Sequence, residues 1–417
     1  MNNTGVVEPE HKRFAALRYR NFRLLWSGMI VSNMGTWMQN VANGWLVLQL
    51  TDSPLWLGLL GFSFAVPMIL IPPFAGAVVD RVHRVRLLFF TQSMQLLNAL
   101  ALALLAWSGN VQVWHILLNA FLGAVLLAFD NPARQALFPD LVAPRDLLNA
   151  LSLNSATYTG AALIGPALGG ILLEPLGAGT LFFFNSLSYL AVIFALAAMR
   201  EVRTHSGGKI GSLGSSFLSG LAYAWSHRLI LALLALSAVG AIFGRSYQNL
   251  LPAFSRDIWH AGAQGYGLLL AAAGAGALIG AFSLASFRQI PHQGALMLTS
   301  GLLFSIALIL FSISPSFILG LILLLVAGVT STVFSTVIAT FIQLSVPNEL
   351  RGRVMSLYTV TLIGLPSLGA MGSGAVAEWL GGVEGAPHAV LIGAAILGVI
   401  LLFVIPMFWK RDLPQRS

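Results

Sequence analysis

The sequence predicts an all-α polytopic membrane protein with twelve transmembrane helices in two pseudo-symmetric six-helix bundles. Three observations lead to this fold class. Of the 417 residues, 57% are hydrophobic and only 9% are charged, whereas a soluble domain carries about 25% charged residues. Apolar stretches long enough to cross about 30 Å of hydrocarbon as a helix recur along the chain. The second half of the chain also repeats features of the first half at a nearly constant offset.

The apolar stretches define the predicted spans, which short polar or glycine-containing turns separate. Because backbone groups in lipid must be satisfied within the protein, we expect each span to be a helix. The spans fall at residues 22–49, 55–79, 86–107, 112–133, 147–173, 178–199, 229–252, 265–287, 294–313, 316–341, 350–378 and 388–409. The resulting organisation is a cytoplasmic N-terminal segment (1–21), a six-helix bundle (22–199), a cytoplasmic linker (200–228), a second bundle (229–409) and a cytoplasmic tail (410–417).

The basic residues predict the direction of the chain across the membrane. If the N-terminus is cytoplasmic, 20 of the 22 Lys and Arg residues are cytoplasmic, with Arg245 inside a span and Arg256 outside. Cytoplasmic loops carry the excess of Lys and Arg, so we expect both termini in the cytoplasm and the protein in a bacterial cytoplasmic (inner) membrane. The net charge of +8 then reflects topology, and we expect no nucleic-acid partner.

Several other function classes find little support in the sequence. The chain has no cysteine, which excludes disulfides, and its histidines lack the spacing of metal ligands, so we expect no metal and no cofactor. The glycine-rich stretch at 273–280 lies inside an apolar span with no strand before it, which favours helix packing over nucleotide binding. An integral-membrane enzyme would need clustered carboxylates, histidines or a nucleophile near one face. That class and a non-transporting receptor or scaffold remain alternatives.

The internal repeat relates the two bundles. A shift of 204 residues superimposes Gly165 and Gly170, in the fifth span, on Gly369 and Gly374 in the eleventh. A shift of 205 superimposes polar and glycine positions of the first span on those of the seventh. Six spans followed by six of the same orientation imply a pseudo-twofold axis along the membrane normal.

A charged motif, GAVVDRVHRVR at 76–86, lies between the second and third spans. It resembles the signature of the major facilitator superfamily, in which a glycine is followed after three residues by Asp-Arg and then by a basic cluster. The resemblance implies a cytoplasmic gate in which Asp80 faces the amino end of the eleventh-span helix, near Asn348, where the helix dipole favours a carboxylate. The gating residues would be Gly76, Asp80, Arg81, Arg84 and Arg86.

The arginines of this motif have two interpretations. They can bind lipid phosphates or acidic partners such as Asp130, Asp140 and Glu349. Alternatively, they only mark the topology of the chain.

Further segments resemble one subgroup of this superfamily. FDNPARQALFPDLV (129–142) and VPNELRGRVMSLY (346–358) are similar to drug-antiporter-like proteins, a subgroup that includes macrolide efflux proteins and the enterobactin exporter. GAALIGPALGG (160–170) resembles a fifth-span motif of exporters, with a helix-packing core of Gly165, Pro166, Gly169 and Gly170. The resemblance implies a monomeric secondary active transporter, in contact with membrane lipid, that exports a lipophilic or amphipathic small molecule and uses protons as the coupling ion. Uptake of a small solute is the alternative within the same fold.

Polar residues inside the first and seventh spans are candidates for a substrate cavity. Polar groups in a span usually face a cavity or a partner helix, so hydrogen bonding between helices is the alternative. The 205 shift places Asn40 on Arg245, so the two sets are expected to face each other across the pseudo-twofold axis. Arg245 could instead extend to the outer interface. The candidates are Asn33, Thr36, Trp37, Asn40, Asn43, Arg245, Tyr247, Gln248 and Asn249.

Asp130 is the candidate for proton coupling. It lies at the inner end of the fourth span, four residues before Arg134. One interpretation is a carboxylate whose protonation is linked to closure of the cytoplasmic side. The other is a local ion pair between residues i and i+4 of one helix.

Overall fold

The computed structural model describes residues 14–79, 81–200, 221–286 and 292–409, and all regular secondary structure within these ranges is helical. The elements of the N-terminal half are η1 (Ala15–Arg18), α1 (Arg20–Thr51), α2 (Pro54–Leu70), α3 (Pro72–Val79), α4 (Arg84–Trp107), α5 (Val113–Leu141), η2 (Pro144–Asp146) and α6 (Leu147–Ala197).

The C-terminal half begins after a helical stretch at residues 221–226. Its elements are α8 (Arg228–Val239), η3 (Gly240–Gly244), η4 (Arg245–Leu250), α9 (Leu251–Ala253), η5 (Phe254–Ile258), α10 (Gly262–Ala285), α11 (Gln293–Ser312), α12 (Phe317–Ser345), α13 (Asn348–Ile363), α14 (Leu365–Trp379), η6 (Gly382–Gly385) and α15 (Ala386–Phe408).

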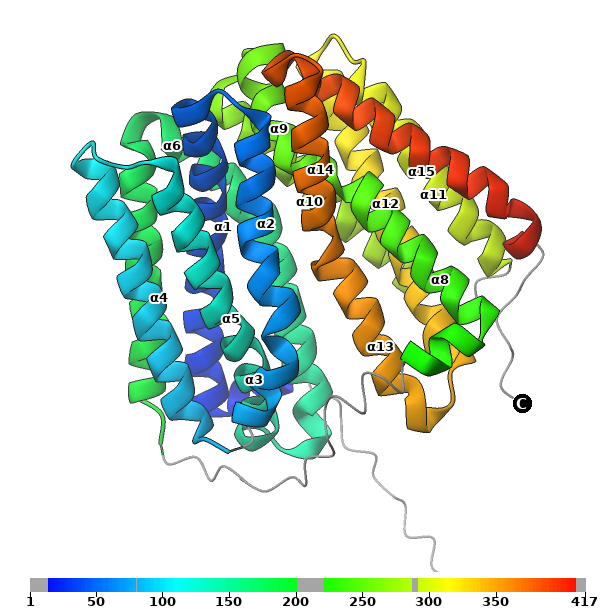
Figure 1. The fold of residues 1–417 in the computed structure, drawn as a ribbon. Coiled ribbons are helices and arrows are strands. Elements are labelled where there is room, and N and C mark those ends of the chain that lie inside the picture. Colours follow the sequence, from blue (N-terminus) through cyan, green and yellow to red (C-terminus); the bar gives the residue numbers. More distant parts are fainter. Residues whose placement is uncertain (1–13, 80, 201–220, 287–291, 410–417) are drawn as a thin grey trace, which may run out of the picture.

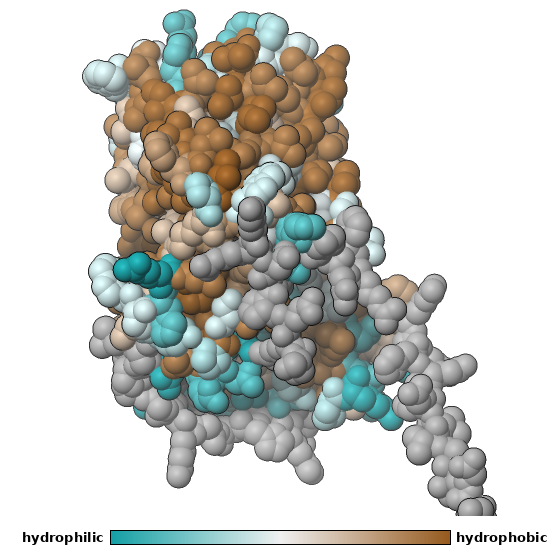
Figure 2. Space-filling view, turned by 90° about the vertical axis from the view of Figure 1, so that its right-hand side faces the viewer, coloured by the Kyte–Doolittle hydropathy of each residue, from teal (hydrophilic) through white to brown (hydrophobic). Residues whose placement is uncertain are grey.

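Helices cover the predicted spans, and nine helical stretches of the described chain are long and apolar enough to cross a membrane, with Pro54–Leu70 a shorter apolar helix. The outer surface agrees with this. Figure 2 shows a broad hydrophobic band on the C-terminal half, between more hydrophilic ends. Large apolar side chains such as Ile318 and Phe403 are mostly exposed on this half, as expected where lipid rather than protein covers them.

Several predicted spans have different boundaries or internal breaks. The fifth and sixth spans are two helices, both within α6, that meet at a kink at Gly177 (φ 75°, ψ 161°). Gly177 lies between the predicted ends at 173 and 178, and glycine adopts positive φ without the steric penalty that a Cβ brings. The second span breaks between α2 and α3 at Pro72, because proline lacks the N–H that would continue the helix.

The seventh span is the least regular. After α8 it passes through a π-helical turn (η3) and a 3-10 stretch (η4) and then, beyond α9, through a second π-helical turn (η5). Glycines 240 and 244 bound the first π turn and Pro252 lies within α9, and both residue types weaken a regular helix. Such π turns are frequent at functional sites.

The two halves stand beside each other (Figure 1), and they meet through two equivalent pairs of helices. α2 packs against α14, and α6 packs against α10. A Cβ added to Gly374 would lie 2.5 Å from the carbonyl oxygen of Pro54, and one added to Gly170 would lie 2.7 Å from that of Ala263. Gly170 and Gly374 are the residues that the 204 shift superimposes, so repeat partners make equivalent contacts between the halves.

The same relation holds inside each half. Gly165 lies against Trp37 of α1, and its repeat partner Gly369 lies against Ile242 of η3. The 205 shift superimposes Trp37 on Ile242. The predicted pseudo-twofold relation therefore describes the packing of the helices as well as the sequence.

The contacts between the halves gather near the turn that follows α1, which the basic residues place on the outer side. There Arg256 forms an ion pair of 2.7 Å with Asp52 and donates a hydrogen bond of 2.9 Å to the carbonyl oxygen of Leu48. Ser53 donates a hydrogen bond of 2.7 Å to the carboxylate of Glu378. From this end the helices of the two halves diverge toward the end that carries α3 and α13 (Figure 1).

Candidate functional site

The predicted cavity residues of α1 form a polar stripe, and its members do not share one environment. The stripe consists of Asn33, Thr36, Trp37, Asn40 and Asn43. At about 100° per residue, Asn33, Trp37 and Asn40 fall within roughly 60° of one another on the helix surface. Asn40 is exposed, and Asn33 and Trp37 are half-buried. Thr36 and Asn43 lie further round the helix, at the edge of the stripe that turns toward the bundle interior.

These two edge residues are enclosed to different degrees. Thr36 is half-buried, donates a hydrogen bond of 3.0 Å to the carbonyl oxygen of Ser32 and shares another with Tyr189 of α6. Asn43 is only 6% exposed, and its side-chain oxygen has no hydrogen-bond partner among the described residues. The prediction that Asn43 lines an open cavity is therefore wrong for this conformation, because the wide stripe wraps from the accessible face of α1 into the bundle.

A buried amide network, absent from the sequence predictions, lies next to this edge. Gln39 donates to the side-chain oxygen of Asn119 at 2.9 Å, and Asn185 donates to the side-chain oxygen of Gln39 at 2.6 Å. Asn119 also donates to the backbone oxygen of Asn98 at 2.8 Å. The network joins α1, α4, α5 and α6. Amide side chains in apolar spans are the sequence signal for it, because buried polar groups in lipid need partners.

Arg245 is an exposed residue at the first position of η4, where the seventh span leaves regular helical geometry. Within the described part of the chain, its guanidinium makes no hydrogen bond and no ion pair. Its positive charge acts on the phenol groups of Tyr158 on α6, Tyr247 in the same span and Tyr358 on α13. A small cavity of about 20 Å³ opens beside it, lined also by Ser237, Gly240, Ala241, Phe304, Ser331, Phe334, Ser335, Ile338 and Leu362.

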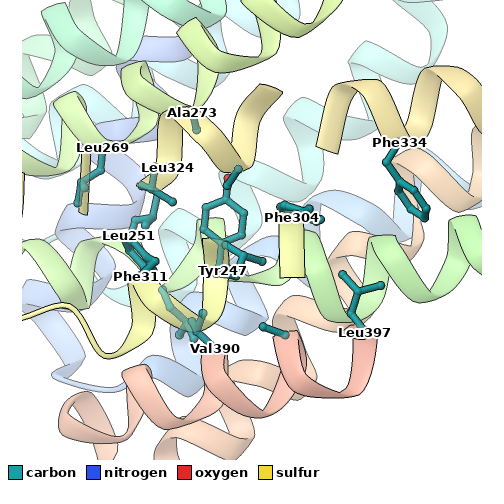
Figure 3. Close-up of a cluster of buried hydrophobic side chains, with 14 of the residues drawn as sticks. Tyr247, Leu251, Leu269, Ala273, Phe304, Phe311, Leu324, Phe334, Val390 and Leu397 are labelled. Atoms are coloured by element: carbon teal, nitrogen blue, oxygen red, sulfur yellow. The ribbon is translucent and has the colours of Figure 1, made fainter. Parts of the chain in front are cut away.

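The three polar neighbours of Arg245 differ in burial. Tyr247 is 4% exposed and lies among Leu251, Phe304 and Phe311 in the core of the C-terminal half (Figure 3). In this conformation Tyr247 therefore packs in the core and does not line an open cavity.

Gln248 and Asn249 are both half-buried. The side-chain oxygen of Asn249 would lie 3.0 Å from a Cβ added to Gly61 of α2. Asn249 thus sits where the two halves meet.

Tyr158 was not among the residues that the sequence predicted for the substrate cavity. It is 59% exposed and forms an edge-to-face pair with Trp37, with ring centroids 6.3 Å apart. A tyrosine within a predicted membrane span was the available signal. The exposed central residues are therefore Asn40, Tyr158 and Arg245, with Trp37 half-buried behind Tyr158.

The charged motif between α3 and α4 is described in part, because Asp80 lies outside the described residues. Arg84 forms an ion pair of 2.6 Å with Asp140 and donates a hydrogen bond of 3.0 Å to the backbone oxygen of Ala136, both on α5. This confirms Asp140 as an acidic partner of the motif. Arg81 and Arg86 are exposed, and a Cβ on Gly76 would meet no atom within 4 Å.

Asp130 is 1% exposed, between α4 and α5. One carboxylate oxygen accepts hydrogen bonds from Thr91 at 2.8 Å and from the side-chain amide of Gln92 at 2.7 Å. The other forms an ion pair with Arg134, one helical turn further on. The local pair expected from the sequence is therefore present, inside a larger buried polar cluster.

The fifth-span motif serves two interfaces at once. Gly165 and Gly169 pack against Trp37 and Met38 of α1, within the N-terminal half. Gly170 packs against Gly267 of α10, in the other half, and the carbonyl of Pro166 also faces Gly267. The motif thus joins the helices of one half and brings the two halves together.

An outer cavity of about 330 Å³ opens where α1, α6 and α10 meet. Its lining includes the indole of Trp45, Gln49 and the carboxylate of Glu174. The described residues contain no group of three His, Asp or Glu side chains that could hold a metal ion.

Comparison with protein families agrees with this architecture. A family model described as transmembrane secretion effector matches residues 11–415. The chain is 26% identical over 329 residues to the staphyloferrin A transporter of Staphylococcus aureus, covering 78% of this chain and 81% of the relative. It is 24% identical over 398 residues to the multidrug efflux pump Tap of Mycolicibacterium fortuitum, covering 93% and 96%. The enterobactin exporter EntS of Shigella boydii is 27% identical over 339 residues, with 79% and 78% covered.

Solved structures share the fold at lower identity. A bacterial homologue of the human lysosomal transporter Spinster, in an inward-facing and unoccupied conformation, superimposes with a TM-score of 0.75 at 16% identity, covering 96% of this chain and 99% of that one. The nucleoside transporter NupG superimposes with a TM-score of 0.76 at 14% identity, with 94% and 100% covered.

Proposed function

This chain belongs to the transmembrane secretion effector family of the major facilitator superfamily, and from that premise we propose that it exports a lipophilic or amphipathic small molecule by alternating access. The observation that carries the proposal is the repeated contact between the halves, Gly170 against Gly267 and Gly58 against Gly374. Two bundles that touch through equivalent pairs of small residues can rock about a shared axis. That rocking would expose a central site to each side of the membrane in turn.

The relatives support the direction of transport and the size of the substrate. Their names describe a multidrug efflux pump, an enterobactin exporter and a staphyloferrin A transporter. A drug-like compound or a siderophore-like metabolite is the substrate that this chain would share with them. The accessible residues Asn33, Trp37, Asn40 and Arg245 would line the central site, with Gln248 and Asn249 near its outer end.

The chain would cross a bacterial inner membrane twelve times, as a monomer in contact with lipid, with both termini in the cytoplasm. The distribution of Lys and Arg supports this orientation. In that orientation the ion pair between Arg256 and Asp52 would lie on the outer side and hold the two halves together there.

The motif between α3 and α4 would act as the cytoplasmic gate, through Gly76, Asp80, Arg81, Arg84 and Arg86. The anchor of Arg84 on Asp140 supports this role, since it fixes the motif to the end of α5. Asp80→Asn should weaken cytoplasmic closure and lower transport while the protein remains in the membrane. Unchanged accessibility of inner-face positions, with full transport, would contradict the gate.

Asp130 would link protons to conformation. It is a buried carboxylate with an arginine partner inside the membrane protein, so its protonation would remove the charge that holds Arg134. Protonation would also weaken the hydrogen bonds that Asp130 accepts from Thr91 and Gln92 of α4, which hold α5 against α4. The alternative is a purely structural ion pair between these two residues, and transport measurements distinguish the two roles.

Transport into everted membrane vesicles tests the function. Vesicles that contain the protein, with an acidic interior, should accumulate amphipathic fluorescent dyes, and a protonophore should abolish the accumulation. Vesicles without the protein are the control. No accumulation of any dye would refute export, movement of dye out of the vesicles would indicate uptake by the cell, and accumulation that survives the protonophore would refute proton coupling.

A further inference from the structure

The outer cavity, of about 330 Å³, is lined by residues of both halves. Its lining includes Trp45 and Gln49 of α1, Glu174 of α6, and Gly262 and Ala263 of α10. Ligand pockets in proteins have volumes of about 300–1,000 Å³, so the cavity can hold a small organic molecule. None of the residues proposed for the central site belongs to this lining, so the cavity is a separate place on the molecule.

Glu174 supplies the charge of the outer cavity. It lies one helical turn beyond Gly170, where α6 touches α10. Its Oε2 atom would lie 3.8 Å from a Cβ added to Gly262, so the carboxylate reaches the first residue of a helix in the other half. Glu174 is exposed, and within the described ranges no hydrogen bond or ion pair engages its carboxylate. The negative charge is therefore available to a ligand in the cavity.

The repeat partner of Glu174 is engaged by the protein itself. The 204 shift places Glu174 on Glu378, and the carboxylate of Glu378 accepts a hydrogen bond of 2.7 Å from Ser53, the residue before α2. The residue before α10 is Ala261, which has no hydroxyl group to donate. The internal repeat thus provides a partner for one carboxylate and leaves the other without one.

The walls beside the two carboxylates differ as well. The 205 shift places Trp45 on Leu250 and Gln49 on Phe254, and both of these C-terminal residues are fully buried. At the corresponding positions of the N-terminal half, an indole and an exposed amide line the outer cavity. The two interfaces therefore share their glycine contacts, but only the interface with Glu174 combines a carboxylate, an aromatic ring and open space.

We propose that the outer cavity binds an organic ammonium ion, with the Glu174 carboxylate opposite the positive charge and Trp45 against the apolar body. An indole attracts a cation through its ring electrons, and the side-chain oxygen of Gln49 can accept a hydrogen bond from an N–H group. The site goes beyond the proposed function, because it is separate from the central site. Since its ligand would contact both halves, binding would favour the arrangement in which they touch.

Binding of a matched pair of probes tests the site. Purified protein in lipid nanodiscs is titrated at neutral pH with 1-naphthylmethylamine, which is protonated, and with the uncharged 1-naphthylmethanol. Empty nanodiscs give the background from lipid. The wild type should bind the amine at least about tenfold more tightly than the alcohol, which corresponds to about 1.4 kcal/mol. Glu174→Gln should abolish this preference, because it removes the charge and keeps the size of the side chain.

Glu378→Gln is the matched control, because Glu378 is the exposed repeat partner and glutamine can still accept the hydrogen bond of Ser53. It should keep the full preference for the amine. Ala178→Leu adds bulk to the lining of the cavity and should weaken binding of the amine while the carboxylate remains. A folded wild type that does not prefer the amine, an unchanged preference in Glu174→Gln, or an unchanged affinity in Ala178→Leu would overturn the site.

Discussion

Closure of the outer side should depend on the absence of a side chain at Gly170. The carbonyl oxygen of Ala263 and the Cα and N atoms of Gly267 would lie 2.7, 2.9 and 3.0 Å from an added Cβ. All three are backbone atoms, so α6 and α10 must separate to admit a methyl group. Overpacking of this kind costs about 1–3 kcal/mol. Because the cost applies only when the halves touch, Gly170→Ala should shift the population toward the outward-open state by about 5- to 150-fold.

A single cysteine can report that shift, because the chain contains none. Ala263 is 3% exposed and lies at the outer end of α10, so Ala263→Cys should react with a membrane-impermeant maleimide only when the halves separate. Adding Gly170→Ala to this cysteine variant should raise its labelling rate by the same factor as the population shift, about 5- to 150-fold. Gly160→Ala is the matched control on the same helix, since a Cβ there meets no atom within 4 Å. Equal labelling of the two variants would refute the steric argument.

Three further outcomes are expected. Gly374→Ala should open the outer side much as Gly170→Ala does. Its control is Gly372→Ala, where a Cβ meets nothing within 4 Å, and this variant should leave maleimide labelling unchanged. Similar labelling of Gly374→Ala and Gly372→Ala would contradict the pseudo-symmetric interface. Arg256→Gln removes the ion pair with Asp52 and should also raise the rate of maleimide labelling from the outer side. In the wild type this rate should rise with salt, because salt screens exposed ion pairs, and in the variant it should not. A variant that is labelled at the wild-type rate would show that the pair contributes nothing to closure. Asp130→Asn should lower pH-gradient-driven transport while dye binding persists, and full transport would reduce Asp130 to a structural role.

The sequence predicted the helical spans well, because each span depends mainly on its own composition. Lipid excludes polar groups wherever they occur, so a run of apolar residues near 300–310 or 390–400 is sufficient to indicate a helix. The break between the fifth and sixth spans was expected, and it lies at Gly177. The breaks inside spans were not predicted: the second span breaks at Pro72, and the seventh span changes its helix type near Arg245. Breaks of this kind depend on how neighbouring helices support freed backbone groups.

The internal repeat and one acidic partner of the charged motif could also be predicted from the sequence. The 204 shift identified Gly170 and Gly374 as equivalent, and the structure shows both at contacts between the halves. The ion pair of Arg84 with Asp140 was among the expected acidic contacts. These predictions concern residues whose neighbours follow from topology and spacing.

By itself, the sequence determined the membrane-spanning fold and its internal symmetry. Only the tertiary structure decided which polar residues meet. It placed Tyr247 in a core and Tyr158 beside Trp37, and it enclosed Asn43 while leaving Asn40 exposed. The physical reason is rotational. Successive residues of a helix turn by about 100°, so a small change in helix type or tilt moves a side chain from an open face into the packed interior, and apolar composition carries no information about that angle.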